Sequence, residues 1–391
     1  MDWKRWIIAR FWTRSRTLSE REPVQAYATA PEACLPAGSI PTEIKRAQAR
    51  SGTPLVRLDL WLERIPGEGE DALPLAESLS DKAALLGVFD GLGGTGSQMA
   101  ILPDGEHRSE AYVASRLVVD TCREFFLELS PRIDIDSAGL VRDLKTRLDA
   151  SLQSGARVVK TNSKLRGTMV NRLPTTLALA YVREQRDGVA RALVIWSGDS
   201  RVYRWGIRAG LAQLTEDDLQ VPGDAFDNLT NDSPISNYIS ASRAYRLNYR
   251  EVRLSVPCVL LAATDGCYDY LPTPMHWEYL LLATLLRNNT VDEWQRDLAQ
   301  RLGKVAGDDV SLALIGLGFE SLGDLKIALG GRFAALNRNY IVPLQEDIGG
   351  DGTGSGTHQQ RVRRQRALAR ALWQQYKLGY EWDGPPIKQE G

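Results

Sequence analysis

Short apolar runs bounded by polar residues and glycine recur along the middle of the chain, and they predict β-strands. Val56–Leu62 alternates between apolar and polar side chains, which is the pattern of a strand with one buried face. Most of the other runs are continuously apolar, as in strands buried on both faces. The turn-like Gln185–Gly188 separates two of them and predicts a hairpin. The other runs cover Leu85–Phe89, Leu177–Val182, Ala192–Ser197, Arg201–Trp205, Val259–Ala263 and Val310–Leu317.

Four stretches instead repeat apolar residues at helical spacing. Glu110–Leu129 is the first, and a second begins at Ser137, which is a suitable N-cap. Met275–Leu286 and Val291–Leu302 form another pair. Helices thus come in pairs between groups of strands and do not alternate with them one by one. This order favours a layered α+β fold over a doubly wound parallel sheet.

The two ends of the chain differ from its middle. Residues 17–50 are rich in Pro, Ala, Glu and Thr and have weak periodicity. The expected division is an N-terminal extension over 1–50, one large domain over 51–320, and a C-terminal extension over 321–391. The chain begins with MDWKRWIIARFWTRSR, which is basic and aromatic. This start is either a locally packed terminus or a surface for a membrane or a partner protein.

The C-terminal extension combines a linker with a basic helix. Asp347–Thr357 is rich in glycine, as flexible linkers are. The segment RVRRQRALARALWQQYKLGYEW then predicts a helix. Three interpretations stay open for this helix: it docks on the domain, recruits a partner protein, or binds an anionic surface. Its predicted apolar stripe contains Leu368, Leu372 and Tyr376, with Ala371 and Gln375 beside it.

Composition excludes several classes of protein. The 391 residues are 43% hydrophobic and 25% charged, which is ordinary for a globular chain, and the formal net charge is -1. This balance gives no basic field for nucleic acid, and no run reaches the ~18 apolar residues of a membrane-spanning helix. The cysteines form no C-x-x-C pair, and only three histidines are present, so a zinc site is not expected. Cys258 and Cys267 lie in or near apolar stretches, which fits reduced thiols and a cytoplasmic protein.

Aspartates mark the ends of the predicted strands. The run LLGVFDGLGGTGS at 85–97 stops at Asp90, and Asp199, Asp265 and Asp308 lie at the ends of three other strands. A single Asp-Gly pair usually caps a turn. Several carboxylates packed together repel one another unless a cation compensates their charge. Without a His or Cys ligand set, the expected cation is a hard one such as Mg²⁺ or Mn²⁺.

Seven segments in a fixed order carry a family resemblance. The chain resembles the metal-dependent Ser/Thr protein phosphatases of type 2C over roughly residues 54–318. That family has the motifs E-D, D-G-x-G-G, G-T-T, G-D-S-R, L-T-x-D-H, S-D-G-x-x-D and D-N-x-[ST]. The matching segments are GEDAL at 69–73, VFDGLGG at 88–94, PTTLALA at 174–180, SGDSRVYRW at 197–205, LTEDD at 214–218, LLAATDGCYDYL at 260–271 and GDDVSLALI at 307–315.

The resemblance implies a fold and a metal site. The fold would be a four-layer αββα sandwich of two antiparallel sheets flanked by helices. Two Mn²⁺ or Mg²⁺ ions would bind at one end, with a third and weaker ion possible. Asp71, Asp90, Asp265 and Asp308 would be the catalytic metal ligands, with Asp71 and Asp90 bridging the ions. The Gly91 carbonyl would complete one sphere, Glu70 would hold a water on a metal, and Asp199 and Asp269 would bind the third ion.

The implied activity is hydrolysis of phosphoserine and phosphothreonine in proteins, opposite a Ser/Thr kinase. Water activated between two ions would attack phosphorus, so no protein nucleophile is needed. The alternative is a phosphatase fold with weak or no activity that binds phosphoproteins as a scaffold through its tail. The family also has a mobile flap beside the site, and by resemblance this flap would fall in the polar segment 220–249 and would select substrates.

Four departures from the motifs keep the alternative open. Leu92 stands where many members have a histidine, and it cannot donate a proton. Pro174 replaces the glycine before the two threonines, and Asp218 replaces a histidine. The nearest candidate for the phosphate-binding arginine is Arg64, which lies seven residues before Asp71 at a loose spacing.

Overall fold

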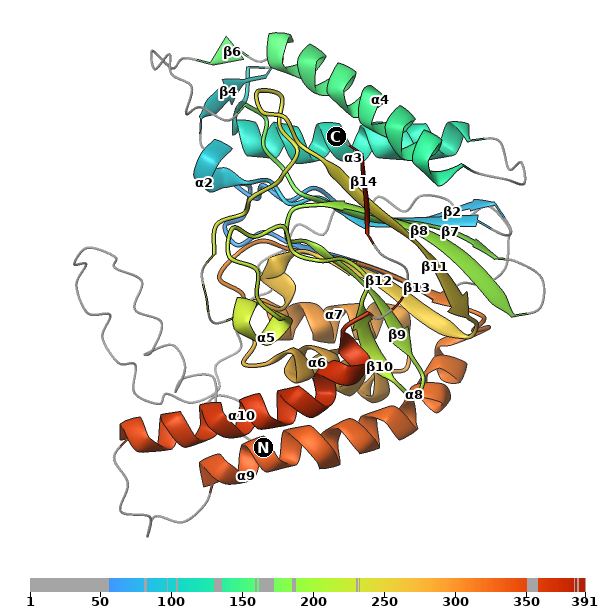
Figure 1. Cartoon of the computed structure of the whole chain (residues 1–391), viewed down its shortest axis with the longest axis vertical. Helices are drawn as coiled ribbons and strands as arrows, with labels where there is room; N and C mark the ends of the chain where they lie inside the picture. The colour runs from blue at the N-terminus through green and yellow to red at the C-terminus, as the bar shows by residue number, and fades with distance from the viewer. Residues whose placement is uncertain are drawn as a thin grey trace, which may run out of the picture. The chain divides into compact units, whose positions relative to one another are not determined.

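The structure is a computed structural model (Figure 1). The basic, aromatic start of the chain, the rest of the N-terminal extension and Cys34 all lie outside the described residues and stay predictions. Described are residues 56–390 except 81–82, 97, 103–104, 130–135, 159, 162–171, 185–187, 230, 232, 350–357, 383 and 385–386.

One antiparallel sheet contains five strands. Its order is β1-β13-β12-β9-β10, so strands from the beginning and the end of the domain lie side by side at one edge. Four of these strands fall on runs that the apolar pattern predicts. The strands are β1 (Arg57–Leu62), β9 (Arg201–Gly206), β10 (Gly210–Gln213), β12 (Cys258–Ala263) and β13 (Val310–Leu317).

A second antiparallel sheet contains six strands in the order β14-β11-β8-β7-β3-β2. The predicted hairpin is present as β7 and β8, whose strands pair along their whole length. The sequence pattern missed β2, β11 and β14. The strands are β2 (Leu75–Ser80), β3 (Ala83–Val88), β7 (Leu177–Glu184), β8 (Val189–Ser197), β11 (Leu247–Ser255) and β14 (Lys388–Glu390).

Helices cover the outer face of each sheet, as Figure 1 shows. The helices α3 (Glu110–Glu128) and α4 (Ser137–Val158) lie over the six-stranded sheet. The helices α6 (Pro274–Arg287) and α7 (Val291–Leu302) lie on the side of the five-stranded sheet, where α7 begins with a capping box from Thr290 to Glu293. This arrangement confirms the predicted α+β fold of two antiparallel sheets flanked by helices.

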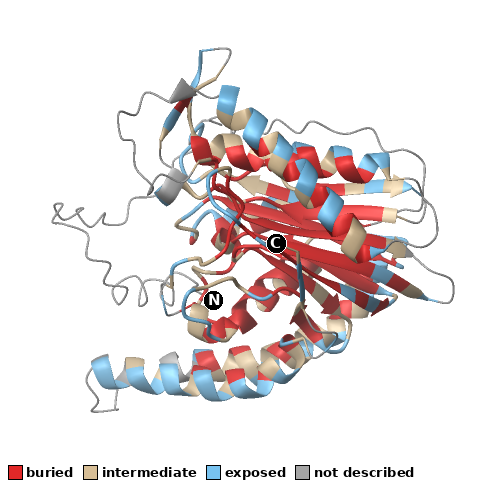
Figure 2. Cartoon of the chain, turned by 45° about the horizontal axis from the view of Figure 1, so that its top comes forward, coloured by how far each residue is buried: buried red, intermediate tan, exposed pale blue. Residues whose placement is uncertain are grey.

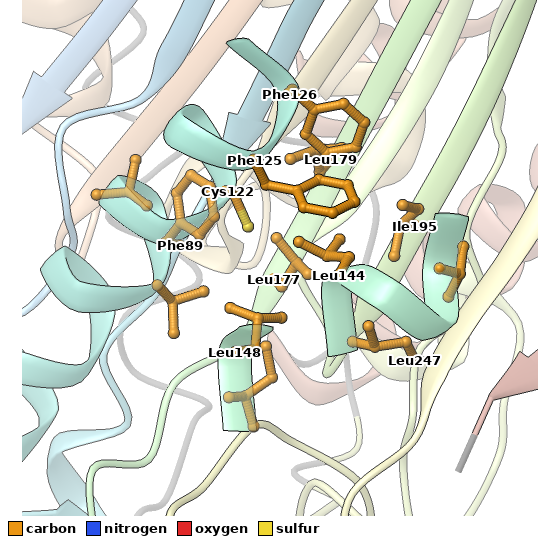
Figure 3. Close-up of a cluster of buried hydrophobic side chains, with 14 of the residues drawn as sticks. Phe89, Cys122, Phe125, Phe126, Leu144, Leu148, Leu177, Leu179, Ile195 and Leu247 are labelled. Carbon is orange, nitrogen blue, oxygen red and sulfur yellow. The ribbon is translucent and has the colours of Figure 1, made fainter. Parts of the chain in front are cut away.

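Two apolar cores hold these layers together, and Figure 2 shows the central strands in red as buried, among them β12 and β13. Between the six-stranded sheet and α3 and α4, Phe89, Cys122 and Phe126 are at most 1% exposed (Figure 3). Between the two sheets the residues are smaller, and Ala178 and Ala313 pack there. Small side chains let the sheets approach closely, so the loops at the strand ends have a rigid support.

The C-terminal residues continue as helices and return to the sandwich. Helix α8 (Leu322–Leu336) leads through a π-helical turn, η2 (Asn337–Ile341), into α9 (Val342–Gly349). Helix α10 (His358–Tyr380) follows, and β14 then extends the edge of the six-stranded sheet at β11. Of the predicted linker, residues 347–349 are helical in α9, and 350–357 lie outside the described residues.

Helix α10 docks on the domain, which is one of the three interpretations of the tail. Its buried stripe is Ala369, Trp373, Tyr376 and Tyr380, each at most 7% exposed. The predicted stripe was therefore wrong except at Tyr376, because Leu368 and Leu372 are only half-buried and Ala371 and Gln375 are exposed. The aromatic residues lie deeper because their polar tips find partners: Trp373 Nε1 donates to Asp224 at 2.9 Å and Tyr376 OH to Glu278 at 2.7 Å.

Smaller elements complete the described structure. The strands β4 (Met99–Ile101), β5 (His107–Ser109) and β6 (Lys160–Thr161) form a small sheet, and α2 (Gly93–Gly96), α5 (Ala225–Asn228) and the 3₁₀ turn η1 (Asp265–Cys267) are single turns. Cys122, Cys258 and Cys267 are buried free thiols. None of the helices in the described ranges is both long and apolar enough to cross a membrane.

Candidate active site

Four aspartates from separate elements lie near one another, and we call them the carboxylate cluster: Asp71, Asp90, Asp199 and Asp265. Asp90 follows β3, Asp265 opens η1 after β12, Asp199 lies in the turn between β8 and β9, and Asp71 precedes β2. The negative charges of Asp71, Asp265 and Asp199 all act on Asp90. Both sheets therefore contribute carboxylates to one place at the ends of their strands.

The surroundings of the cluster disfavour negative charge. Removal from water and the charge of Asp309 raise the pKa of Asp71 to about 7. Removal from water and nearby carboxylates, Asp217 first, raise the pKa of Asp199 to about 7 as well. The same causes place the pKa of Asp90 and Asp265 well above the ordinary value. Without a cation, the cluster therefore retains protons near neutral pH.

Asp71 is the most enclosed member of the cluster, with 2% of its surface exposed. Its carboxyl group is hydrogen-bonded to that of Asp90, which lowers the pKa of Asp71 against the larger effect of its removal from water. Thr264 Oγ1 donates to Asp71 Oδ2 at 3.0 Å, and the indole of Trp61 donates to the Asp71 carbonyl at 3.0 Å. Core strands thus fix Asp71 before any ligand arrives.

Asp309 organises the segment that carries Glu70 and Asp71, and sequence reasoning missed it. It is 8% exposed, and its carboxylate accepts backbone N–H groups of Arg64 at 2.7 Å and Glu70 at 2.6 Å. Asp308 is exposed, accepts from the Asp309 N–H at 2.9 Å, and acts electrostatically on Asp90 and Asp265. The second acid of GDD, placed after a loop, was the available signal.

Glu70 lies against the start of α3. Removal from water raises the pKa of Glu70, while Ser109, the N-cap of α3, hydrogen-bonds to the Glu70 side chain. The Glu70 carbonyl accepts from Ser115 Oγ at 2.5 Å and from Arg116 Nη1 at 3.0 Å, and Gly69 O accepts from Arg116 Nη2 at 3.3 Å. The side chain of Arg116, which sequence reasoning missed, therefore contacts this segment. Arg64 is exposed and contacts Asp309 through its backbone.

The glycines after Asp90 allow close approach between segments. A Cβ at Gly91 would lie 2.6 Å from the Glu70 carbonyl oxygen and 2.7 Å from that of Ala111. The Asp90 carbonyl accepts from Thr175 Oγ1 at 2.7 Å and from the Thr176 N–H at 2.8 Å. A glycine is therefore needed directly after Asp90, because the backbone there passes between α3 and the Glu70 segment.

The predicted departures have structural roles. The Pro174 carbonyl accepts the N–H of Leu92, which is half-buried. Asp218 accepts from the Gly198 N–H at 3.0 Å and from Asn237 Nδ2 at 2.7 Å, so it ties a loop to the residue before Asp199. Pro174 and Asp218 thus each accept a hydrogen bond from backbone near a motif aspartate.

Asp199 and Asp269 are held through their neighbours. Tyr268 OH donates to the Asp199 carbonyl at 2.7 Å, and the guanidinium of Arg201 lies 4.1 Å from the centre of the Tyr268 ring. Arg201 forms a buried ion pair with Asp217, with 2.9 Å and 2.5 Å contacts. The Asp269 N–H donates to the Asp265 carbonyl at 2.8 Å.

The donor set fits a hard divalent cation, because every candidate side chain offers oxygen. A cation would also offset the negative charge that Asp71 places beside Asp90. Within the part of the chain that the structure describes, however, no group of three or more His, Cys, Asp or Glu side chains is closed into a metal-holding arrangement. The carboxylates are gathered but not drawn into a coordination sphere.

Comparison with known proteins gives the family. The family model described as Protein phosphatase 2C matches residues 69–304, which is more than half of the chain. No curated protein gave a significant match.

Among solved structures, Stp1 of Staphylococcus aureus, a serine/threonine phosphatase, is 18% identical, covers 70% of this chain and 99% of its own, and has a TM-score of 0.48. The serine/threonine phosphatase PstP/Ppp of Mycobacterium tuberculosis is 15% identical over 68% of this chain and 99% of its own, with a TM-score of 0.47. The family model spans the segments that carry Glu70, Asp90, Asp199 and Asp265. The chain therefore belongs to the protein phosphatase 2C family of metal-dependent Ser/Thr protein phosphatases.

Proposed function

We propose that this chain hydrolyses phosphoserine and phosphothreonine in proteins with two Mn²⁺ or Mg²⁺ ions, opposite a Ser/Thr kinase. The observation that supports this most is the carboxylate cluster. Four carboxylates whose surroundings disfavour their charge destabilise a fold unless they serve a cation.

The proposed ligands are Asp71, Asp90, Asp265 and Asp308 with the Gly91 carbonyl, while Asp199 and Asp269 would take a third ion. When bound, the ions would supply a water of lowered pKa and neutralise the phosphoryl oxygens. The chain's own part is to hold the ligands rigidly at strand ends. Glu70, fixed against α3 by Ser109, would orient a water, and Arg64 would bind the phosphate of the substrate.

The test is phosphate release from a phosphothreonine peptide with Mn²⁺, with Mg²⁺ and with a chelator. Release is expected only with a metal, and Asp90→Asn and Asp265→Asn should each reduce it to the chelator level. Asp59→Asn is the matched control, because Asp59 is exposed on β1. Metal-independent release, or full activity in both cluster variants, would contradict the proposal.

A second candidate function is a scaffold that binds phosphoproteins without hydrolysing them. Leu92 has no proton to donate to a leaving alkoxide, and Arg64 is exposed, so these two positions favour it. A scaffold should bind a phosphothreonine peptide in calorimetry equally well with and without metal, and should release no phosphate.

A further inference from the structure

One loop connects the carboxylate cluster to the C-terminal helix. We call residues 219–229 and 233–239 the α5 loop, because α5 lies within it. Its two arms pair with each other: Leu219 bridges Ile235, and the Gln220 N–H donates to the Pro234 carbonyl at 2.9 Å. The α5 turn therefore projects from a narrow two-armed base.

Both arms of this loop end beside the cluster. Asp218, the residue directly before the first arm, accepts the N–H of Gly198, the residue before Asp199. Ile239, at the end of the second arm, exchanges two 3.0 Å hydrogen bonds with Thr175, whose hydroxyl donates to the Asp90 carbonyl. The position of the loop is therefore set at its base by the same backbone that carries Asp90 and Asp199.

The α5 turn itself is held from outside by α10. Asp224, the N-cap of α5, accepts from Trp373 Nε1 at 2.9 Å and from Lys377 Nζ at 3.3 Å. The Phe226 ring stacks on the Trp373 ring, with centroids 6.4 Å apart and planes 21° apart. Arg370 pairs with Asp227. A four-residue turn cannot hold its own conformation, so these contacts decide where it stays.

The α5 turn also contacts the buried ion pair between Arg201 and Asp217, which lies near Asp199. Asn228 Nδ2 donates to Asp217 Oδ2 at 2.8 Å, and Asp217 pairs with Arg201. Arg201 lies over Tyr268, which donates to the Asp199 carbonyl. The α5 turn thus contacts α10 on one side and the Arg201–Asp217 ion pair on the other, and Figure 1 shows α5 and α10.

We propose that α10 clamps the α5 loop beside the carboxylate cluster and so determines which phosphorylated segments the site accepts. The proposal rests on the proposed phosphatase function. The two arms of the loop are hydrogen-bonded to the backbone around Asp199 and Asp90, so a loop held by α10 lies next to the carboxylates that a phosphopeptide has to reach. The clamp consists of side chains of α10 that take no part in the chemistry.

The decisive variant is Arg370→Ala/Lys377→Ala, which removes two contacts from α10 and leaves the loop sequence intact. Arg364→Ala/Arg366→Ala is the matched control, with the same loss of charge on exposed positions of the same helix. Trp373→Phe adds a conservative variant that keeps the stacked ring and removes the hydrogen bond to Asp224.

Two readouts decide the proposal. In the decisive variant, amide hydrogen exchange in residues 219–229 should become about tenfold faster, which corresponds to a loss of about 1.4 kcal/mol of local stability. Exchange in β3 should stay unchanged. Hydrolysis of p-nitrophenyl phosphate should stay within twofold of the unaltered protein. For at least one pair of phosphothreonine peptides with different flanking residues, the ratio of their kcat/KM values should change at least fivefold.

Unchanged exchange in the loop overturns the clamp, and quickened exchange with an unchanged peptide ranking overturns its role in specificity. The control variant should match the unaltered protein in both readouts. If the unaltered protein releases no phosphate from any substrate, the phosphatase proposal fails, and hydrogen exchange alone decides whether α10 clamps the loop.

Discussion

At the residue scale, the support of the site depends on side chains that bind backbone. Arg116 holds the carbonyls of Gly69 and Glu70, while Asp309 holds the N–H groups of Arg64 and Glu70. Charged side chains therefore hydrogen-bond both to carbonyl groups and to N–H groups of the segment before Asp71. Hydrogen bonds of this charge-assisted kind are stronger than neutral ones and give fixed geometry.

Arg116→Met tests that support. The guanidinium stacks on Tyr112 at 3.5 Å from the ring centre, and removing it leaves buried carbonyls with fewer donors. The expected loss of unfolding free energy is about 1.5–3 kcal/mol, measured by urea denaturation. The Mn²⁺ concentration for half-maximal activity should also rise, because Glu70 and Asp71 lose their alignment.

Arg123→Met is the control for that prediction, because Arg123 lies on the same helix and pairs with Glu77 and Asp120 at the surface. Its loss should cost less than about 1 kcal/mol. Arg116→Lys should restore part of the metal response. Equal effects of Arg116→Met and Arg123→Met on metal response would show that Arg116 does not position the segment.

At the element scale, α10 is attached by polar tips of aromatic residues as well as by apolar area. Tyr376 OH donates to Glu278, which also accepts from Trp205 Nε1 at 3.2 Å and from Arg332 Nη2 at 2.6 Å. Tyr376→Phe leaves three N–H donors, from Trp205 and Arg332, on this buried carboxylate, so the expected loss of unfolding free energy is about 1–2 kcal/mol.

Denaturant unfolding of Tyr376→Phe beside Tyr340→Phe checks this prediction. Tyr340 is half-buried and its ring meets the Tyr376 ring edge-on, with centroids 5.4 Å apart, so Tyr340 packs in the same interface. Its removal should change stability by less than 0.5 kcal/mol, the range of ordinary surface changes. If Tyr340→Phe costs as much, the hydrogen bond to Glu278 is not what attaches α10.

The elements also show what the sequence could reveal. Strands with continuous apolar runs, such as β12 and β13, were predictable because burial on both faces leaves no polar position. Strand β11 was missed because its buried positions include Asn248 and Arg250, whose partners Asp218 and Glu216 lie about thirty residues away in the chain. Pattern reading registers polarity, but it cannot see a distant partner that satisfies it.

The same limit applies to the site. Most motif aspartates were predictable because they lie at one end of an apolar run, and Asp90 and Asp265 do lie within reach of one another's charge. Arg116 and Asp309 were missed because each binds backbone of a segment that only the fold brings close. On α10, the stripe was misplaced because counting apolar residues ignores aromatic residues with polar tips.

At the scale of the whole molecule, the cluster links stability to pH. Asp71 and Asp199 have pKa values of about 7 in the fold, and the pKa of Asp90 and Asp265 is higher than normal. Unfolded aspartates have ordinary pKa values near 3.9. Between these values the folded state binds more protons than the unfolded state, so the free energy of unfolding must fall as pH rises from about 4 to above 7.

A bound divalent cation should reverse this trend, because it replaces the protons with charge that does not titrate. Without metal, the unfolding free energy should therefore fall from pH 5 to pH 8.5. With Mn²⁺ at a hundred times its dissociation constant, the unfolding free energy should be about 2.7 kcal/mol higher than without metal at the same pH. Thermal unfolding in chelator and in Mn²⁺ at several pH values measures both effects.

Asp90→Asn separates the cost of the cluster from its use. In chelator at pH 8.5 the variant should be more stable than the unaltered protein, because it removes one member of a group of repelling carboxylates. In Mn²⁺ it should be less stable, since it loses much of the increment from the metal. Asp59→Asn should change neither value. If Asp90→Asn destabilises the metal-free protein, Asp90 is there for folding; if it stabilises that protein, the fold tolerates four crowded carboxylates because a cation uses them.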